Sequence, residues 1–343
     1  MSNPDTALID QAWPAADLEA VHTCPFCGSS ARRLAYGDVQ DWAFYCAPGK
    51  WNYWDCSDCQ ALYLDPRPTA QSIDRAYSTY YTHGQRALTR IAQVFKTALR
   101  NACYLHWFGI KLRPRLYFPA WAAPLLDRLA GRFIIPFGLQ ELAQMQAGSL
   151  LDLGCGSGDF LLQAQQAGWQ ALGIDLDNRA CEVARGKGLR VINAGVEHLA
   201  ELEEKFDCLF CSHILEHTYD PNRVLQLMKA VLKPGGKILL SLPNAQSVFR
   251  YHFNKDWRGL EAPRHLAIPA ASSLKRQLEE LGFEVQASLR HSIFTSAESF
   301  QIRRRAQSLS PQDLRLAQAL SEELPVSDYS VADFVHFSCR LRA

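Results

Sequence analysis

No apolar run in this chain of 343 residues approaches the ~20 residues that a membrane-spanning helix needs, so an integral membrane protein is not expected. The first residues, MSNPDTALIDQAWPAADLE, lack both a basic segment and an apolar core, so no secretory signal is expected. An excess of charge is also missing, because 36 basic side chains are balanced by 35 acidic ones. Apolar residues make up 48% of the chain, enough for a large packed core. These features favour a cytoplasmic protein of two or three domains.

The most informative segment is LLDLGCGSGDF, residues 150–160. An apolar run ends in Gly154, Gly156 and Gly158, and a helical pattern follows at once. This pattern is typical of a buried strand leading into a tight turn, where missing side chains let a ligand approach the backbone. A second apolar strand, ALGIDLD, carries Asp175 where a carboxylate can accept hydrogen bonds from ribose hydroxyls. The pattern predicts a site for a cofactor that contains adenosine.

The glycine spacing differs from the G-x-G-x-x-G pattern of dinucleotide sites, because Asp159 stands in place of the third glycine. A carboxylate in the first turn of the helix would repel a pyrophosphate. It is compatible with S-adenosylmethionine, which carries a cationic sulfonium and an ammonium. Asp152, two residues before the first glycine, fits the same sign of charge. The sequence therefore favours a methyl donor over a nicotinamide dinucleotide.

The order of elements beyond residue 200 extends this interpretation. Strands are expected at residues 206–213, in GGKILLSLPN, in FEVQASLR and in FVHFSCRL, with helices between them. At LDLGCGSG, GID, HILEHTYDP, LKPGG, SLPN and WRGLEAPRHL the chain resembles class I S-adenosylmethionine-dependent methyltransferases. The resemblance is to the branch that includes ubiquinone-biosynthesis and bacterial surface-sugar enzymes. It implies an α/β fold with a seven-stranded, Rossmann-like sheet in a methyltransferase domain at residues 147–343.

The resemblance also implies which residues hold the donor. At the methionine end of the donor these are Asp152, Gly154 and Gly156, and at the ribose it is Asp175. At the adenine they are Leu176, Val196 and Glu197. Ser212 lies at the end of the fourth strand. An Asp-Ala pair that is common at the adenine is replaced here by Gly195-Val196-Glu197. The contacts at residues 195–197 are therefore the least secure of the set.

Eleven cysteines are present, and four of them form two CxxC pairs, in CPFCG and CSDC. Four thiolates from two tight turns can close a tetrahedral shell around a structural zinc ion, and these ligands are Cys24, Cys27, Cys56 and Cys59. The metal would stabilise a small zinc-ribbon module at residues 20–70, in which DWAFYC and WNYWDC are strand-like. A redox role is the alternative, but a thioredoxin-like motif would need a βαβ pattern that is absent here.

Residues 71–146 are expected to form a helical linker or insertion that is basic and aromatic. Between residues 85 and 140 the many basic side chains have one acid among them, Asp127. A helix here would turn its basic side chains away from an apolar face made by Leu88, Ile91, Phe95, Leu99 and Ala102. Such a helix can contact an anionic membrane surface or a lipid-linked or nucleotide-linked acceptor, or it can pack on the catalytic domain. The sequence leaves both alternatives open.

Three histidines are candidates for the base that removes a proton from the methyl acceptor. His213 ends the predicted strand 206–213, His217 follows it after four residues, and His265 lies in WRGLEAPRHL. Open α/β sheets carry their chemistry at the carboxyl ends of the strands, which favours His213. For each histidine a structural imidazole is the alternative. A metal bound by His213 and His217 is discounted, because the sequence shows no third ligand.

The leading prediction is a cytoplasmic S-adenosylmethionine-dependent methyltransferase that methylates oxygen or carbon of a small molecule or carbohydrate. A nucleotide sugar or glycan intermediate is a plausible acceptor, with peripheral contact at the inner face of the membrane as an option. One alternative is an RNA methyltransferase that docks through the ribbon and the basic segment. Nucleic acid is a poor partner for the ribbon, however, because acids outnumber bases between Cys24 and Cys59. A non-catalytic, donor-binding scaffold is the second alternative.

Overall fold

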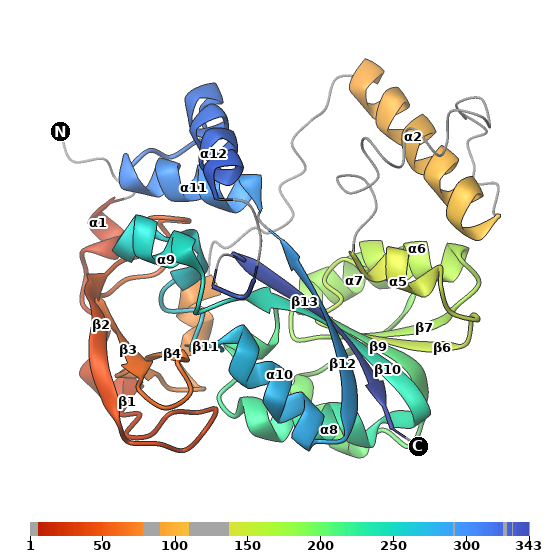
Figure 1. The fold of residues 1–343 in the computed structure, drawn as a ribbon, viewed down its shortest axis with the longest axis horizontal. Helices are drawn as coiled ribbons and strands as arrows, with labels where there is room; N and C mark the ends of the chain where they lie inside the picture. Colours follow the sequence, from red (N-terminus) through yellow and green to blue (C-terminus); the bar gives the residue numbers. More distant parts are fainter. Residues whose placement is uncertain are drawn as a thin grey trace. The chain divides into compact units, whose positions relative to one another are not determined.

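The structure is a computed structural model, and it describes residues 6–77, 90–109, 137–290, 292–324, 328–330 and 332–342 (Figure 1). Two compact units are distinguished by their internal contacts. Unit 1 comprises residues 1–81, 212–226 and 240–337, and unit 2 comprises residues 82–211, 227–239 and 338–343. The modules predicted at residues 20–70, 71–146 and 147–343 stay a prediction.

The main sheet has seven strands in the order β12-β13-β10-β9-β6-β7-β8. This confirms the predicted α/β fold with a Rossmann-like sheet. The strands are β6 (Ser149–Leu153), β7 (Gln170–Asp175), β8 (Arg190–Asn193), β9 (Phe206–Ser212), β10 (Leu232–Pro243), β12 (Phe283–Arg290) and β13 (Phe334–Leu341). β6 pairs in parallel with β7 and β9, so that Leu153 lies opposite both Ile174 and Cys211. These three strands therefore end at the same edge of the sheet.

Unit 2 packs helices against the parallel strands. These helices are α2 (Arg90–Phe108), α5 (Phe137–Leu142), α6 (Asp159–Gln166) and α7 (Asn178–Gly186). Every residue of β6 is buried, as expected of a parallel strand covered on both faces. Leu99 and Tyr104 of α2 lie in one apolar cluster with Leu139, Leu150 and Phe210. At these two positions the amphipathic helix packs on the core of its own unit.

The basic face predicted for this helix is not described. Leu88 and Arg86 lie outside the described residues, as do residues 110–136. Within α2 the backbone is described, but the side chains of Arg90, Lys96 and Arg100 are not. The predicted contact with an anionic surface therefore stays a prediction. No helix among the described residues is long and apolar enough to cross a membrane.

Unit 1 is built around a four-stranded antiparallel sheet in the order β11-β4-β3-β2. The strands are β2 (Arg32–Val39), β3 (Trp51–Cys56), β4 (Leu62–Leu64) and β11 (Ala267–Ile268). A smaller sheet pairs β1 (Leu18–Glu19) with β5 (Arg67–Pro68). The helices of this unit include α1 (Thr6–Ile9), α9 (Val248–Phe253), α10 (Ala271–Glu280), α11 (Ile293–Arg303) and α12 (Pro311–Glu323). Helix α8 (Pro221–Ala230) begins in unit 1, and its last four residues belong to unit 2. The pairing of β11 with β4 joins the segment after His265 to the cysteine-rich segment.

One local prediction in this unit is wrong. WNYWDC forms β3 as expected, but DWAFYC, residues 41–46, is a turn rather than a strand. The Asp41 carboxylate accepts the backbone N–H groups of Phe44, Cys46 and Ala47, and this folds the chain back on itself. Tyr45 takes a positive φ of 57°, which a strand does not allow. The aspartate overrides the strand preference of the aromatic residues beside it.

Candidate functional site

The glycine loop connects β6 to α6 in unit 2. Gly154, Gly156 and Gly158 have φ values of 79°, 52° and 77°, in the left-handed region that favours glycine. A side chain at Gly158 would also clash, because its Cβ would lie 2.4 Å from Leu189 Cδ1. Gly158 therefore lets the loop pack closely against α7 and the turn that follows it. The loop has the conformation that the sequence predicts.

Asp175 ends β7 and ties this loop to the strand. Its Oδ2 atom accepts the Gly156 N–H at 2.7 Å, and Oδ1 accepts the Asp177 N–H at 2.8 Å. Each carboxylate oxygen has further capacity to accept a hydrogen bond from a ribose hydroxyl. Leu176 beside it is 76% exposed, which offers an uncovered apolar surface to a planar ring. The residues at this strand end fit an adenosine ligand.

Asn193, at the end of β8, is a member of this site that the sequence did not reveal. Its side-chain amide donates to the carbonyl oxygens of Asp175 and Leu176, both at 2.9 Å. It thereby fixes the backbone of the two predicted donor contacts. Val196 and Glu197 open the short helix at Val196–Glu201, with Val196 half-buried and Glu197 exposed. Their predicted contact with the adenine edge stays a prediction.

The charge argument from Asp159 is weaker than the sequence suggests. Lys187 Nζ lies 2.6 Å from Asp159 Oδ1 and also donates to the Ser157 carbonyl at 2.8 Å. A carboxylate paired with a lysine repels a pyrophosphate less than an isolated one. The preference for a methyl donor therefore needs evidence other than this charge.

Unit 1 contains a second polar site, the histidine cluster, defined as His213, Glu216, His217 and His265. His213 directly follows β9 and has a positive φ of 57°. Its Nδ1 atom lies 3.1 Å from Glu216 Oε1. The Glu216 side chain is fully buried, whereas that of His213 is 47% exposed. The carboxylate can thus orient an imidazole that solvent and ligands can reach.

The two groups shift each other's pKa. Burial lowers the pKa of His213, but the hydrogen bond to Glu216 and its negative charge outweigh burial, so the pKa is raised overall. Burial raises the pKa of Glu216, but the hydrogen bond to His213 and the charges of the neighbouring imidazoles together outweigh it, so that pKa is lowered overall. Glu216 is therefore a carboxylate at neutral pH, as an orienting group must be.

His217 and His265 are tied to backbone carbonyls. His217 Nδ1 lies 2.9 Å from the Arg264 oxygen, and His265 Nδ1 lies 2.7 Å from the Gly259 oxygen. The two rings meet edge to face with centroids 4.7 Å apart. His265 is 5% exposed, and burial lowers its pKa to about 4. These contacts favour positioning roles for both histidines, and the buried, neutral His265 is a poor candidate for a base.

Two groups of described residues have ligand types and spacing suited to a metal ion. One is the set of four cysteines, and the other is Glu216, His217 and His265, with one possible ligand atom from each within 4.8 Å of the others. The pair considered from the sequence was His213 and His217, so this second group shares only His217 with it. Glu216 Oε1 contacts His213, and Oε2 has no hydrogen-bond partner among the residues that the structure describes. The contact that the structure shows for Glu216 is the one that orients His213.

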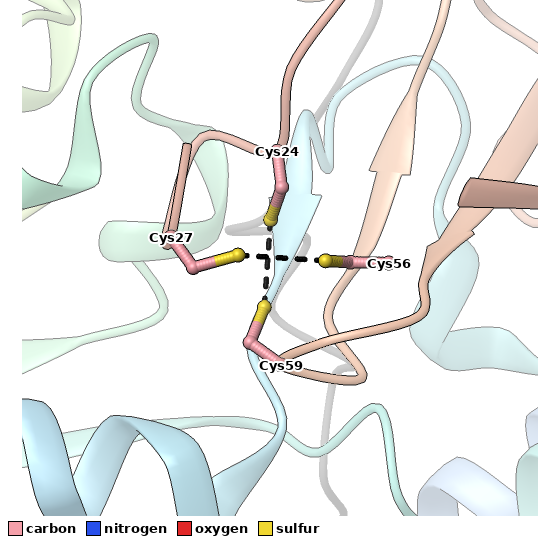
Figure 2. Close-up of side chains that lie close together, drawn as sticks. All are labelled: Cys24, Cys27, Cys56 and Cys59. Carbon is pink, nitrogen blue, oxygen red and sulfur yellow. Dashed lines mark hydrogen bonds between the residues drawn. The ribbon is translucent and has the colours of Figure 1, made fainter. Parts of the chain in front are cut away.

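The four cysteines form the cysteine cluster, Cys24, Cys27, Cys56 and Cys59. Figure 2 shows their sulfur atoms converging from two turns on one point. Sγ of Cys24 lies 3.5 Å from that of Cys59, and the other two sulfur atoms lie 3.4 Å apart. Zn–S bonds of ~2.3 Å in a tetrahedron place sulfur atoms ~3.8 Å apart, so the cluster is close to the size that zinc requires. The donor set and its geometry both fit a structural zinc ion.

Comparison with known proteins shows what part of the chain is similar to. Residues 124–288 match a family described as a methyltransferase domain. The match covers just under half of the chain, and the cysteine cluster lies outside the matched residues.

Two curated relatives each match less than a third of the chain. The ubiquinone biosynthesis O-methyltransferase of Bordetella avium is 38% identical over 114 residues, which are 31% of this chain and 47% of the relative. That of Haemophilus ducreyi is 36% identical over 106 residues, 28% of this chain and 45% of the relative. The chain spans about half the length of the curated relatives it matches. An Archaeoglobus fulgidus SAM-dependent methyltransferase structure is 21% identical with a TM-score of 0.43, and the match covers 63% of this chain and 93% of that one.

Asp152, in β6, gives the first testable prediction. It is 2% exposed, and burial, aided by the charge of Asp175, raises its pKa to about 8. Because the folded protein holds this proton to a higher pH than the unfolded chain, Asp152 makes stability fall between about pH 4 and pH 8. In Asp152→Asn this decline is lost, so we expect a melting temperature several degrees above wild type at pH 8.

The sequence predicts Asp152 at the methionine end of the donor. The same substitution should therefore weaken S-adenosylmethionine binding about tenfold, because an amide cannot ionise beside an ammonium group. Thermal unfolding at pH 5 and pH 8, together with calorimetric titration of the donor, measures both effects. Asp159→Asn on the exposed side of the loop is the control and should keep the wild-type decline. An equal pH dependence in all three proteins would contradict the assignment.

Proposed function

We propose that the protein transfers a methyl group from S-adenosylmethionine to an oxygen or carbon atom of a small molecule or carbohydrate, with His213 as the general base. The observation that carries this proposal is the contact between His213 Nδ1 and the buried Glu216 carboxylate. A carboxylate that fixes one ring nitrogen leaves the other free to take a proton. The methyltransferase match over residues 124–288 supports the reaction class.

S-adenosylmethionine, when bound, supplies the methyl group on its sulfonium. The residues proposed to hold it are those of the glycine loop and the adjacent strand ends, Asp152, Gly154, Gly156, Asp175, Leu176, Val196, Glu197 and Ser212. Glu216 accepts a hydrogen bond from the Nδ1–H of His213 and so keeps the Nε2 lone pair available. Nε2 takes the proton of the acceptor as the new bond forms, and Glu216 stabilises the resulting imidazolium. His217 and His265 position this pair.

The acceptor proposal has two branches. The names of the curated relatives support O-methylation of a ubiquinone precursor or a similar phenol. The cysteine module and the basic segment support the alternative in surface-sugar metabolism, a nucleotide sugar or glycan intermediate. Methyl transfer from labelled S-adenosylmethionine to quinone-like phenols, nucleotide sugars and lipid-linked glycans tests both. Turnover of one class identifies it, and failure with all of them, despite bound donor, favours the scaffold alternative.

We also propose that the cysteine cluster holds one structural zinc ion. The support is the convergence of four sulfur atoms from two turns, with no open position for a substrate. Elemental analysis of protein purified without chelator should find one equivalent of zinc. Less than about half an equivalent would reject the proposal, because a site of four thiolates binds zinc tightly.

A further inference from the structure

Both turns of the cysteine cluster are attached to the chain segments that carry the histidine cluster. Cys56 is the last residue of β3, and the turn through Cys59 leads into β4. The backbone N–H of Leu64 in β4 donates to the Leu266 oxygen at 2.9 Å. β4 also pairs with β11, which begins directly after that residue. The turn and the segment that ends in His265 therefore share one sheet.

This connection continues to the proposed base. The Leu266 N–H donates to the Glu216 carbonyl at 2.8 Å, and the Glu216 side chain contacts His213. His217 Nδ1 lies against the Arg264 carbonyl, one residue before His265. Three successive hydrogen bonds thus lead from β4 to His213. A displacement of β4 would be transmitted to the imidazole.

Tyr53 in β3 makes a second connection. Its side chain is fully buried, and its hydroxyl lies 2.5 Å from the Leu260 oxygen and 2.8 Å from the His265 oxygen. The two carbonyls belong to the ends of the segment 260–265, so one hydroxyl sets the spacing of the loop that carries His265. Phenylalanine would fill the same space without either contact. Tyr53 lies three residues before Cys56.

The other turn of the cluster is held from a different side. The Asn222 side-chain amide donates to the carbonyl oxygens of Pro25 and Phe26, each at 3.0 Å. Gln277 donates to the Phe26 oxygen at 2.9 Å and to Asn222 Oδ1 at 2.7 Å. Asn222 lies in the first turn of α8, five residues after His217. The side chains of Asn222 and Gln277 thus hold this turn through its backbone carbonyls, although neither residue is a metal ligand.

We propose that the cysteine cluster sets the geometry of the histidine cluster and that Tyr53 is the positioning residue that links them. This inference rests on the proposed role of His213 and adds the residue through which the metal module acts on it. The module then serves as part of the acceptor side of the protein rather than as a separate binding domain. Zinc binding to the four cysteines would then change the geometry of the His265 and His213 imidazoles, and the glycine loop of unit 2 would stay unchanged.

The first test compares Tyr53→Phe with Tyr36→Phe. Tyr36 is a matched control because its buried hydroxyl, on the neighbouring strand β2, contacts Arg250 and not the histidine segment. Spectra of the protein labelled with carbon-13 in its histidine rings, assigned with His213→Gln and His265→Gln, report the geometry directly. We expect the His265 and His213 signals to move in Tyr53→Phe and to stay in Tyr36→Phe. Turnover should fall about tenfold in Tyr53→Phe, with the KM for the donor unchanged within about twofold.

The second test uses the wild-type chain and zinc alone. Removal of zinc with a high-affinity chelator should move the His265 and His213 signals, and re-addition of zinc should restore them. Unchanged signals after zinc release, or equal spectra and turnover for the two tyrosine variants, would overturn the inference. Because the spectra need no acceptor, they decide the inference even if no methyl transfer is found. Should Tyr53→Phe fail to fold, the zinc measurement decides.

Discussion

Replacement of His213 by glutamine is expected to lower kcat about 10²- to 10⁴-fold while S-adenosylmethionine still binds. Glutamine keeps a polar side chain but cannot take a proton at neutral pH. His213 is not among the residues proposed to bind the donor, so the donor affinity should change less than about twofold. Single-turnover methyl transfer and calorimetric titration of the donor measure the two quantities. A variant that retains more than a tenth of the wild-type kcat would remove His213 from the role of base.

Glu216→Gln extends this test to pH. Glu216 raises the pKa of His213, and a base must be unprotonated, so wild-type turnover should decline as the pH falls through this raised pKa. Without the carboxylate charge the His213 pKa drops, and the acidic limb of the pH profile moves to lower pH. The plateau should fall as well, because the imidazolium loses its counter-ion. Glu280→Gln, on the exposed side of α10, is the control and should leave the profile in place.

The part of the site that could be predicted from sequence is the part that local pattern encodes. The glycine loop, Asp175 and the strand that ends before His213 are each specified by a run of about ten residues. Glu216 is only three residues from His213, yet its burial and its contact could not be read from HILEHTYDP. His213 has a positive φ, which changes the direction of the chain. The sequence pattern does not predict where the Glu216 side chain points after such a change.

The residues that hold the histidine cluster were hidden for a different reason. Arg264 contacts Asp41, which is 223 positions away, and Tyr53 contacts the His265 carbonyl 212 positions away. Such pairs arise from the tertiary fold, and no spacing rule in one sequence marks them. The aromatic segment at residues 41–46 misled for the same reason, because its conformation follows from the three N–H groups that Asp41 accepts. Local propensity therefore predicted the elements, and long-range polar contacts decided the site.

The largest effect on stability is expected at Arg264. Its guanidinium and the Asp41 carboxylate are both fully buried, with contacts of 2.6 Å and 3.1 Å, and Glu261 lies 3.1 Å from Arg264 Nε. Arg264→Met removes the cation that pairs with the buried carboxylates of Asp41 and Glu261. Removal of one partner of a buried pair costs about 3–5 kcal/mol, so the free energy of unfolding should fall by that amount in urea titrations. Arg190→Met breaks an exposed pair with Glu204 and should cost less than about 1 kcal/mol.

A second substitution at Arg264 separates a role of this ion pair in stability from a role in positioning the histidine cluster. Arg264→Lys keeps the charge but cannot contact Asp41 through two nitrogen atoms, so it should recover part of the stability and little of the turnover. If Arg264 served stability alone, turnover would recover in parallel with the free energy of unfolding. The Arg264 carbonyl also contacts His217 Nδ1. We therefore expect turnover to recover less than the free energy of unfolding. The conformation of the segment around His265 would then depend on two contacts from distant parts of the sequence. These are the ion pair of Arg264 with Asp41 and the hydrogen bonds of the Tyr53 hydroxyl.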